Sequence, residues 1–144
     1  MDQKAYAVVT GDVVRSSSIE SNFNEVLEEI AGEIRQHKAP GFLLEIYRGD
    51  SFQGLLEAPE LAMSVGILIR AGLRRHSRQS GRGLDDIWDA RISIGVGTLK
   101  GYTPGTTNRI GSLEGEAFQL SGKALDAMKG AKNRLVVTTG KQQL

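Results

Sequence analysis

The chain has 144 residues, of which 40% are hydrophobic and 24% charged, and its formal net charge is +1. These totals predict one globular domain, residues 1–144, large enough to bury a core without disulfides. The near-neutral charge excludes a strong global field for nucleic acid or membrane surfaces, and the lack of cysteine excludes disulfides, thiolate zinc sites and a cysteine nucleophile. No apolar run reaches membrane-spanning length and no signal-peptide pattern is present, so we expect a cytoplasmic protein.

The first half of the chain predicts a strand, a helix and a hairpin. Residues 5–12 are small and β-branched, as in a strand buried on both faces. Hydrophobic residues at helical spacing predict an amphipathic helix over about residues 19–38. Two strand-like runs, about residues 42–48 and 51–57, then flank Gly49-Asp50, and this dipeptide is typical of a hairpin turn.

The second half predicts a helix, a strand, a further helix and a last strand. Pro59 is expected to begin the first of these helices, and its predicted buried face comprises Leu61, Val65, Leu68 and Gly72, widened by Ile69 and Leu73. A strand follows over residues 90–98, with Ile92, Ile94 and Val96 on one face and Arg91, Ser93, Gly95 and Gly97 on the other. Because glycines recur on the second face, we expect something to approach the backbone closely there.

A long polar loop, residues 100–112, separates that strand from the last two elements. Loops of this length in compact domains are often functional. The helix is predicted over about residues 114–129, and the last strand over residues 134–138. Trp88 and Tyr102 are expected to pack at the bases of the loops.

The order of the elements matches the split β-α-β, ferredoxin-like motif. We therefore predict an α+β fold: a ferredoxin-like βαββαβ core with an added helix and strand, forming an antiparallel sheet with helices on one face. In this topology the first and third strands are antiparallel neighbours. Asp12, at the end of the first strand, would then lie beside Asp50, at the hairpin.

This pair of acids is the main candidate for chemistry. Two carboxylates at about 4 Å repel by roughly 4 kcal/mol at an effective dielectric constant of 20, so they need a cation, a shared proton or a neighbouring base. Mg²⁺ or Mn²⁺ suits oxygen ligands and is commonly held by one or two carboxylates together with substrate phosphates. The alternative is a structural ion pair, in which Arg15 or Arg48 neutralises the acids.

Two other groups of residues can be interpreted either as functional residues or as ordinary structural features of a helix. Residues 15–18 fit a phosphate-binding turn at a helix N-terminus, and they fit an ordinary N-cap equally well. Gln119 and Lys123 share an exposed helix stripe, which by itself is typical of a solvated face. The arginines near the end of the second helix are interpreted as a solvated end that offsets the helix dipole: Arg70, Arg74, Arg75 and Arg78. Too few aromatic residues accompany them to support nucleic acid as a partner.

Four blocks, residues 10–16, 49–56, 91–97 and 115–119, resemble the SatD family. In the same order they are similar to a trimmed class III nucleotidyl cyclase catalytic domain, related to GGDEF and other palm-type domains. The resemblance implies Asp12, Asp50 and the Val13 carbonyl as ligands of Mg²⁺ or Mn²⁺. It implies a nucleoside triphosphate as partner, held by Val14, Arg15, Ser16, Ser17 and Arg48. It also implies Gln119 and Lys123 as catalytic residues that stabilise the transition state across a homodimer interface.

The chain departs from the cyclase pattern at several of these positions. Lys123 replaces an arginine and lacks its planar fork. Ile46 stands where adenylyl cyclases carry a base-reading lysine, whose acidic partner would fall near Ser112. Ser51 replaces a glutamate that is common after the hairpin aspartate. The sequence therefore leaves three hypotheses: a metal-dependent nucleotidyl or phosphoryl transferase, a non-catalytic nucleotide-sensing or protein-interaction module, and a structural dimerisation domain.

Overall fold

The computed structural model describes residues 4–14, 23–47, 50–79, 87–104 and 109–140. Its strands are β1 (Tyr6–Val14), β2 (Leu43–Tyr47), β3 (Ser51–Leu56), β4 (Asp89–Gly97) and β5 (Leu135–Thr139). Its helices are α1 (Phe23–His37), α2 (Ala62–Gln79) and α3 (Glu116–Met128), with short 3₁₀ turns η2 (Pro59–Leu61) and η4 (Ile110–Ser112). The order of the elements is the predicted one.

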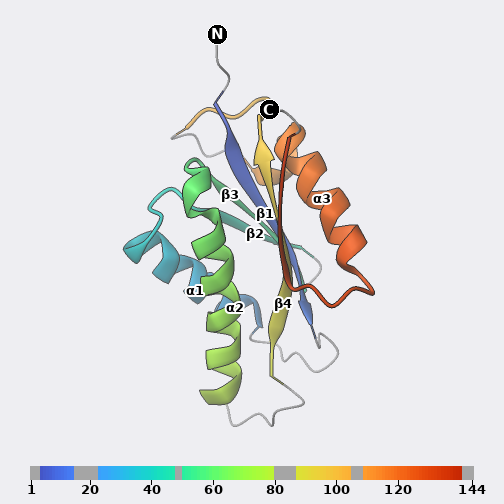
Figure 1. Ribbon diagram of the computed structural model, residues 1–144. Helices are drawn as coiled ribbons and strands as arrows, with labels where there is room; N and C mark the ends of the chain where they lie inside the picture. The colour runs from blue at the N-terminus through green and yellow to red at the C-terminus, as the bar shows by residue number, and fades with distance from the viewer. Residues whose placement is uncertain (1–3, 15–22, 48–49, 80–86, 105–108, 141–144) are drawn as a thin grey trace.

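The five strands form one sheet in the order β2-β3-β1-β4-β5 (Figure 1). Strand β1 lies in the middle and pairs antiparallel with both β3 and β4. The first four strands therefore have the ferredoxin-like arrangement, and the prediction of an α+β fold of this class is confirmed. The added strand β5 pairs parallel with β4, so the sheet is mixed rather than wholly antiparallel.

Helices α1 and α2, the two helices of the ferredoxin-like core, cover one face of the sheet as predicted (Figure 1). The added helix α3 packs on the other face. Strand geometry shows this, because Ile94 of β4 lies against Gly66 of α2, whereas the next residue, Gly95, lies against the backbone of α3. Successive strand residues point to opposite faces. Gly95 confirms that a second element approaches the glycine-bearing face of β4.

The buried face of α2 differs from the prediction. Pro59 begins the 3₁₀ turn η2, and α2 itself starts only at Ala62. Ala62, Val65, Ile69 and Leu73 are buried, whereas Leu68 is 41% exposed. Gly66 faces Leu135 of β5, and residues two apart on a helix point in nearly opposite directions, so Leu68 turns away from the sheet.

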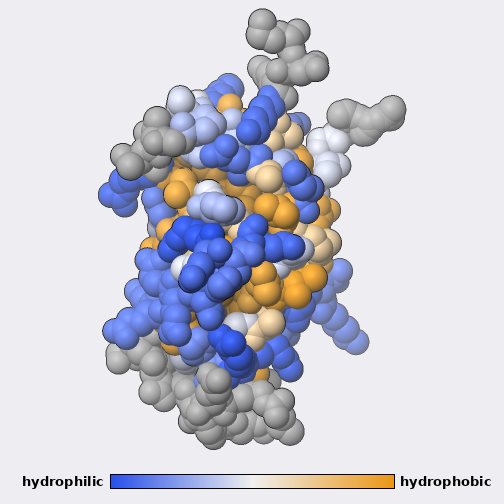
Figure 2. Space-filling view, turned by 90° about the vertical axis from the view of Figure 1, so that its left-hand side faces the viewer, coloured by the Kyte–Doolittle hydropathy of each residue, from blue (hydrophilic) through white to orange (hydrophobic). Residues whose placement is uncertain are grey.

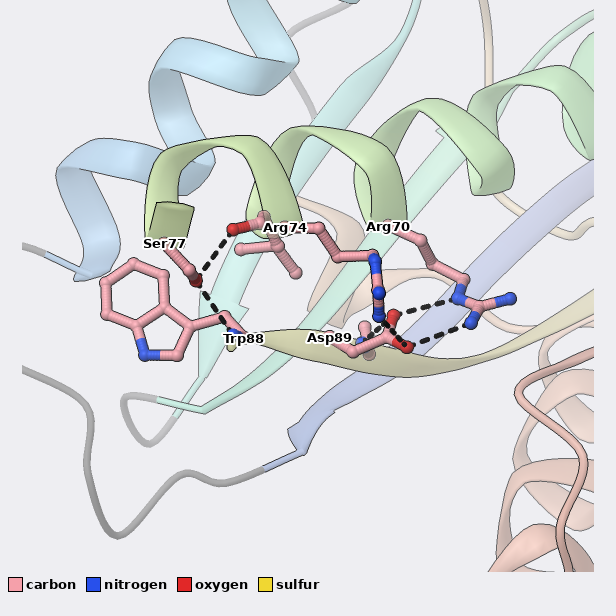
Figure 3. A network of polar contacts seen from close by, with 7 residues as sticks. Arg70, Arg74, Ser77, Trp88 and Asp89 are labelled. Carbon is pink, nitrogen blue, oxygen red and sulfur yellow. Dashed lines mark hydrogen bonds and ion pairs between the residues drawn. The ribbon is translucent and has the colours of Figure 1, made fainter. Parts of the chain in front are cut away.

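The start of β4 is tied to α2 by a polar network (Figure 3). Arg70 donates two hydrogen bonds to Asp89, from Nε to Oδ1 at 2.8 Å and from Nη2 to Oδ2 at 2.9 Å. Arg74 lies 3.6 Å from the same carboxylate, and the Trp88 amide donates to Ser77 Oγ at 2.8 Å. The interpretation of Arg70 as part of a merely solvated helix end was therefore wrong, whereas the Arg74 side chain is 54% exposed. Arg70 ties α2 to the position at which β4 enters the sheet.

Asp89 is held ionised by this network. Burial by itself raises the pKa of its carboxyl, but the hydrogen bonds from Arg70 and the Ala90 amide, with the nearby charges of Arg70 and Arg74, lower the pKa further than burial raises it. The net pKa lies below the ordinary value. Trp88 packs edge-to-face on Phe23, with ring centroids 5.5 Å apart, so this residue lies on the core directly before β4, as expected.

The side of the molecule that carries α1 and α2 is largely hydrophilic, with hydrophobic patches between the charged residues (Figure 2). The large hydrophobic residues exposed on α2 are Met63, Ile67 and Leu68. Within the described ranges, none of the helices combines the length and the hydropathy needed to span a membrane.

Candidate functional site

The register of the central strands brings Asp12 and Asp50 to the same end of the β1–β3 pair. Asp12 lies directly opposite Ser51, and the amide of Val13 donates to the carbonyl of Asp50 at 2.9 Å. Residues of two distant segments are therefore backbone neighbours, as the topology predicts. Ser51, directly across from Asp12, shares its face of the sheet.

Gly11 leaves room for the ring of Phe52, a core residue directly opposite it in the β1–β3 pair. Gly11 lies opposite Phe52, and a Cβ atom at Gly11 would be 2.4 Å from the Phe52 ring. The ring therefore occupies the space that a side chain at position 11 would need, on the face covered by α1 and α2. Asp12 and Ser51, the next residues on their strands, consequently point to the opposite face, which carries α3.

Arg91 is a site residue that the sequence reasoning missed. It lies opposite Asp12 on β4, and its Nε donates to Asp12 Oδ1 at 3.0 Å. The two side chains are 26% and 14% exposed. The counter-ions weighed from the sequence were Arg15 and Arg48, both of which lie outside the described residues. Only the β1–β4 register identifies Arg91, because 79 positions separate it from Asp12.

The residues at this end of the sheet fit a hard divalent cation. The described ranges contain no group of three or more His, Cys, Asp or Glu side chains placed to hold a metal, which argues against an all-protein cage there. Two aspartates and a backbone carbonyl instead match a cation that takes its other ligands from water and from substrate phosphates. Asp12, Asp50 and the Val13 carbonyl stay the predicted ligands of Mg²⁺ or Mn²⁺, and the structure brings Asp12 and the backbone of Asp50 to the same end of the sheet.

Helix α3 is held against the sheet face that carries Asp12. Ser121 Oγ and Thr10 Oγ1 are hydrogen-bonded at 2.9 Å, and Thr10 precedes Asp12 by two residues on the same face of β1. Gln119 and Lys123, the predicted catalytic residues, lie two positions on either side of Ser121 and are exposed. Within one chain, α3 therefore directs Ser121, rather than Lys123, toward the sheet.

Gln119 contributes to a groove of about 320 Å³ between β3, η4 and the start of α3. Its lining combines two side-chain amides and one acidic residue with apolar and glycine surface: Gln53, Ile110, Gly111, Leu113, Glu114, Gly115, Phe118 and Gln119. Gln53 follows Ser51 by two residues on the same strand and the same face, so the groove adjoins the Asp12 end of the sheet. A second hollow of about 290 Å³ lies between α1 and α2, on the other face.

Glu45 holds one wall of this groove in place, a role that no sequence pattern indicated. Its Oε2 accepts a hydrogen bond from the Ile110 amide at 2.8 Å, and its Oε1 accepts one from the Tyr47 hydroxyl at 2.7 Å. Burial raises the pKa of Glu45, but the hydrogen bonds from Tyr47, Ile110 and Gly111, with the charge of Arg109, lower it below its ordinary value. Burial and the contact with Glu45 raise the pKa of Tyr47 to about 12.

Ile46, at the position of the base-reading lysine of adenylyl cyclases, does not face the groove. Ile46 packs against the core on the α1 and α2 face. Strand alternation places its neighbours, Glu45 and Tyr47, on the groove side instead. An adenylyl-cyclase type of base recognition by a lysine at position 46 is thus absent.

The phosphate-binding residues implied by the resemblance are largely outside the described ranges. Arg15, Ser16, Ser17 and Arg48 all fall there. Val14 is the last residue of β1 and pairs with Asp89, so it belongs to the strand rather than to the turn. The strand ends two residues later than predicted because β4 continues to pair with it beyond Asp12.

Comparison with protein-family models and with curated proteins gives no match. Comparison with solved structures gives several cyclase domains. The guanylyl cyclase Cya2 matches with a TM-score of 0.62 and 18% identity, over 88% of this chain and 71% of that one. The active GGEEF domain of a diguanylate cyclase from Vibrio cholerae matches with a TM-score of 0.58 and 14% identity, over 97% and 85% of the two chains.

A third structure, the monomeric guanylyl cyclase domain of the RhoGC fusion protein from Blastocladiella emersonii, has a TM-score of 0.59 and 15% identity over 86% of this chain and 75% of that one. At these identities the likeness concerns the fold. The chain has a nucleotidyl cyclase-like fold, as the four sequence blocks predict.

Proposed function

We propose that this domain binds a nucleoside triphosphate together with Mg²⁺ or Mn²⁺ through Asp12 and Asp50. The observation that carries the proposal is the pairing of β1 with β3, in which the Val13 amide bonds to the Asp50 carbonyl at 2.9 Å. This pairing brings two acids from distant segments to one edge of a sheet whose fold is cyclase-like. The SatD resemblance supports the proposal and stays a prediction.

The groove beside Gln53 is the proposed site of the nucleoside. It adjoins Asp12 on the same face, and Phe118, Ile110 and Leu113 give it an apolar lining on which a flat base can lie. Amides donate and accept hydrogen bonds equally well, so Gln53 and Gln119 suit the polar edge of a base. Glu45 keeps the η4 wall in place through the Ile110 and Gly111 amides.

If the domain is catalytic, the reaction is nucleotidyl or phosphoryl transfer. A bound cation would supply charge stabilisation at the phosphates. Asp12 and Asp50 would orient the phosphate chain, and Gln119 or Lys123 would donate hydrogen bonds to oxygens that gain charge. Because Lys123 is exposed on α3, we propose that it acts in the site of a second copy, in a homodimer.

Calorimetric titration tests the binding proposal. We expect Mn²⁺ with a nucleoside triphosphate to bind the wild-type chain, and Asp12→Asn or Asp50→Asn to weaken binding at least tenfold, because each change removes a charged ligand. Asp126→Asn is the matched control: Asp126 is 81% exposed and contacts only Lys129 among the described residues. It should bind as the wild type does.

Two results would contradict the proposal. Absence of metal-dependent nucleotide binding in the wild-type chain would remove it, whatever the behaviour of the variants. Equal loss of affinity in Asp12→Asn and Asp126→Asn would show a general effect of charge rather than a site.

The second candidate is a non-catalytic nucleotide-sensing or protein-interaction module of the same fold. It is favoured by Ile46, which is part of the core, and by Lys123, which replaces an arginine. Binding of Mn²⁺ and nucleotide without product after long incubation would support this function. Detection of pyrophosphate or inorganic phosphate, lost in Asp12→Asn, would support the catalytic one.

A further inference from the structure

Strand β4 carries residues of two arginine–aspartate pairs that differ in geometry. Asp89 uses both carboxylate oxygens to bind Arg70, at 2.8 and 2.9 Å, and also accepts the Ala90 amide. Asp12 accepts from Arg91 through a single Nε–Oδ1 contact of 3.0 Å. Within the described ranges this is the only hydrogen bond on the Asp12 carboxylate.

The single contact is the easier one to break. A bidentate pair loses two charge-assisted hydrogen bonds on opening, whereas the Arg91–Asp12 pair loses one. Arg91 is also more exposed than Asp12, at 26% against 14%, so water can solvate its guanidinium once it leaves. Asp12 is the less exposed partner and needs a cation in either state.

We propose that Arg91 is the resident counter-ion of Asp12 and that a divalent cation binds by displacing its guanidinium from that carboxylate. This inference rests on the proposed function, because it concerns the same aspartate. It assigns Arg91 as a positioning residue: it neutralises Asp12 before the cation arrives and opposes the binding of a cation that comes without anionic ligands.

This role reverses the effect that removal of Arg91 should have on metal affinity. A purely structural Arg91 would support the site, so its removal would weaken metal binding or leave it unchanged. A competing Arg91 has the opposite effect. Without it, the cation breaks no charge-assisted hydrogen bond and meets no second positive charge beside Asp12.

Electron paramagnetic resonance of free Mn²⁺, in the absence of nucleotide, measures this effect. We expect Arg91→Gln to bind Mn²⁺ about tenfold more tightly than the wild-type chain. Arg91→Lys keeps a positive charge but loses the Nε contact, so its affinity should fall between the two. It also serves as the second variant if Arg91→Gln does not fold, which circular dichroism and a thermal melt would show.

Arg70→Gln is the matched control, because it removes the same type of side chain from an aspartate outside the proposed site. It should lower the melting temperature, since Asp89 loses its bidentate partner, and leave the Mn²⁺ affinity unchanged. An affinity gain shared by Arg70→Gln and Arg91→Gln would reflect net charge alone and would overturn the inference.

The remaining outcomes separate the inference from the proposed function. If the wild-type chain binds Mn²⁺ and folded Arg91 variants bind it equally or more weakly, the counter-ion role is wrong and the metal site stands. If neither the wild-type chain nor the Arg91 variants bind Mn²⁺, with or without a nucleoside triphosphate, the metal site itself is wrong, and Arg91 is a structural partner of Asp12.

Discussion

At the scale of single residues, the fold and the site depend on acids whose partners come from other elements. Asp12 meets Arg91 of β4, Asp89 meets Arg70 of α2, and Glu45 meets the amides of η4. Glu45 and Asp89 both have a pKa below the ordinary value, because their hydrogen bonds outweigh the effect of burial. Each therefore links the stability of the fold to pH.

The sign of this linkage follows from the direction of the pKa shifts. A carboxyl whose pKa is lower in the folded chain contributes its full stabilisation above its unfolded pKa, which is about 4.5 for Glu45. The contribution is lost as the pH falls from there through the lower pKa of the folded state. Stability should thus decline in acid, whereas near neutral pH both groups contribute fully and cause no change of stability with pH.

We expect Glu45→Gln to lower the free energy of unfolding at pH 7 by about 1 kcal/mol, since a partly exposed carboxylate loses its charge-assisted hydrogen bonds. The variant should lose less stability than the wild-type chain between pH 5 and about pH 3. Urea unfolding at several pH values measures both effects. Parallel decline of the two proteins with pH would contradict the role assigned to Glu45.

At the scale of elements, the placement of α3 depends on Gly95. A Cβ atom there would lie 2.3 Å from the Ala117 carbonyl oxygen and 2.6 Å from the Ser121 amide nitrogen. Both contacts are with backbone atoms, which cannot rotate away as the end of a side chain can. The close approach allows Ser121 to reach Thr10, and this contact fixes α3 over the face that carries Asp12.

We expect Gly95→Ala to destabilise the domain by about 2–3 kcal/mol or more, because α3 must move away from β4. Gly122→Ala on α3 is the matched control. Nothing lies within 4 Å of a Cβ atom at Gly122, so alanine should stabilise the helix by about 0.5–1 kcal/mol. Thermal and urea unfolding compare the two, and a neutral Gly95→Ala would show that α3 is not held as described.

At the scale of the whole molecule, the fold does not bring all the proposed site residues together within one chain. Asp12, Arg91 and the groove share one face of one chain, whereas Lys123 is exposed on the far side of α3 from Thr10. A function for Lys123 at phosphates thus requires a second copy, as in the homodimer that the resemblance implies.

We expect Mn²⁺ with a non-hydrolysable triphosphate analogue to raise the dimer fraction of the wild-type chain, because the ligand would then be held from both copies. Lys123→Ala should abolish most of this increase. Lys129→Ala, at an exposed position at the end of the same helix, should not. Sedimentation velocity measures the dimer fraction, and a ligand-independent value in the wild type would contradict a shared site.

The amino-acid sequence by itself determined the elements, their order and the pairing of β1 with β3. Strand alternation, helical spacing and the Gly49-Asp50 turn are patterns among residues that are close in the sequence. Few topologies can connect the elements that these patterns predict. The position of Asp50 near Asp12 follows from that topology. On α2, the predicted burial of Val65, Ile69 and Leu73 is confirmed, and that of Leu68 was wrong, because Gly66 faces the sheet and a residue two positions on points nearly the opposite way.

Only the tertiary structure decided which charges meet. Arg91 and Asp12 are 79 positions apart, and Ile110 and Glu45 are 65 apart. Their contacts depend on the register of two strands and on the path of a loop, which no local spacing encodes. The side of the sheet on which α3 lies also depends on tertiary structure, because the α3 backbone packs where a side chain at position 95 would be. A one-residue change of register would turn Asp12 toward the opposite face, so the site depends on the assembled sheet.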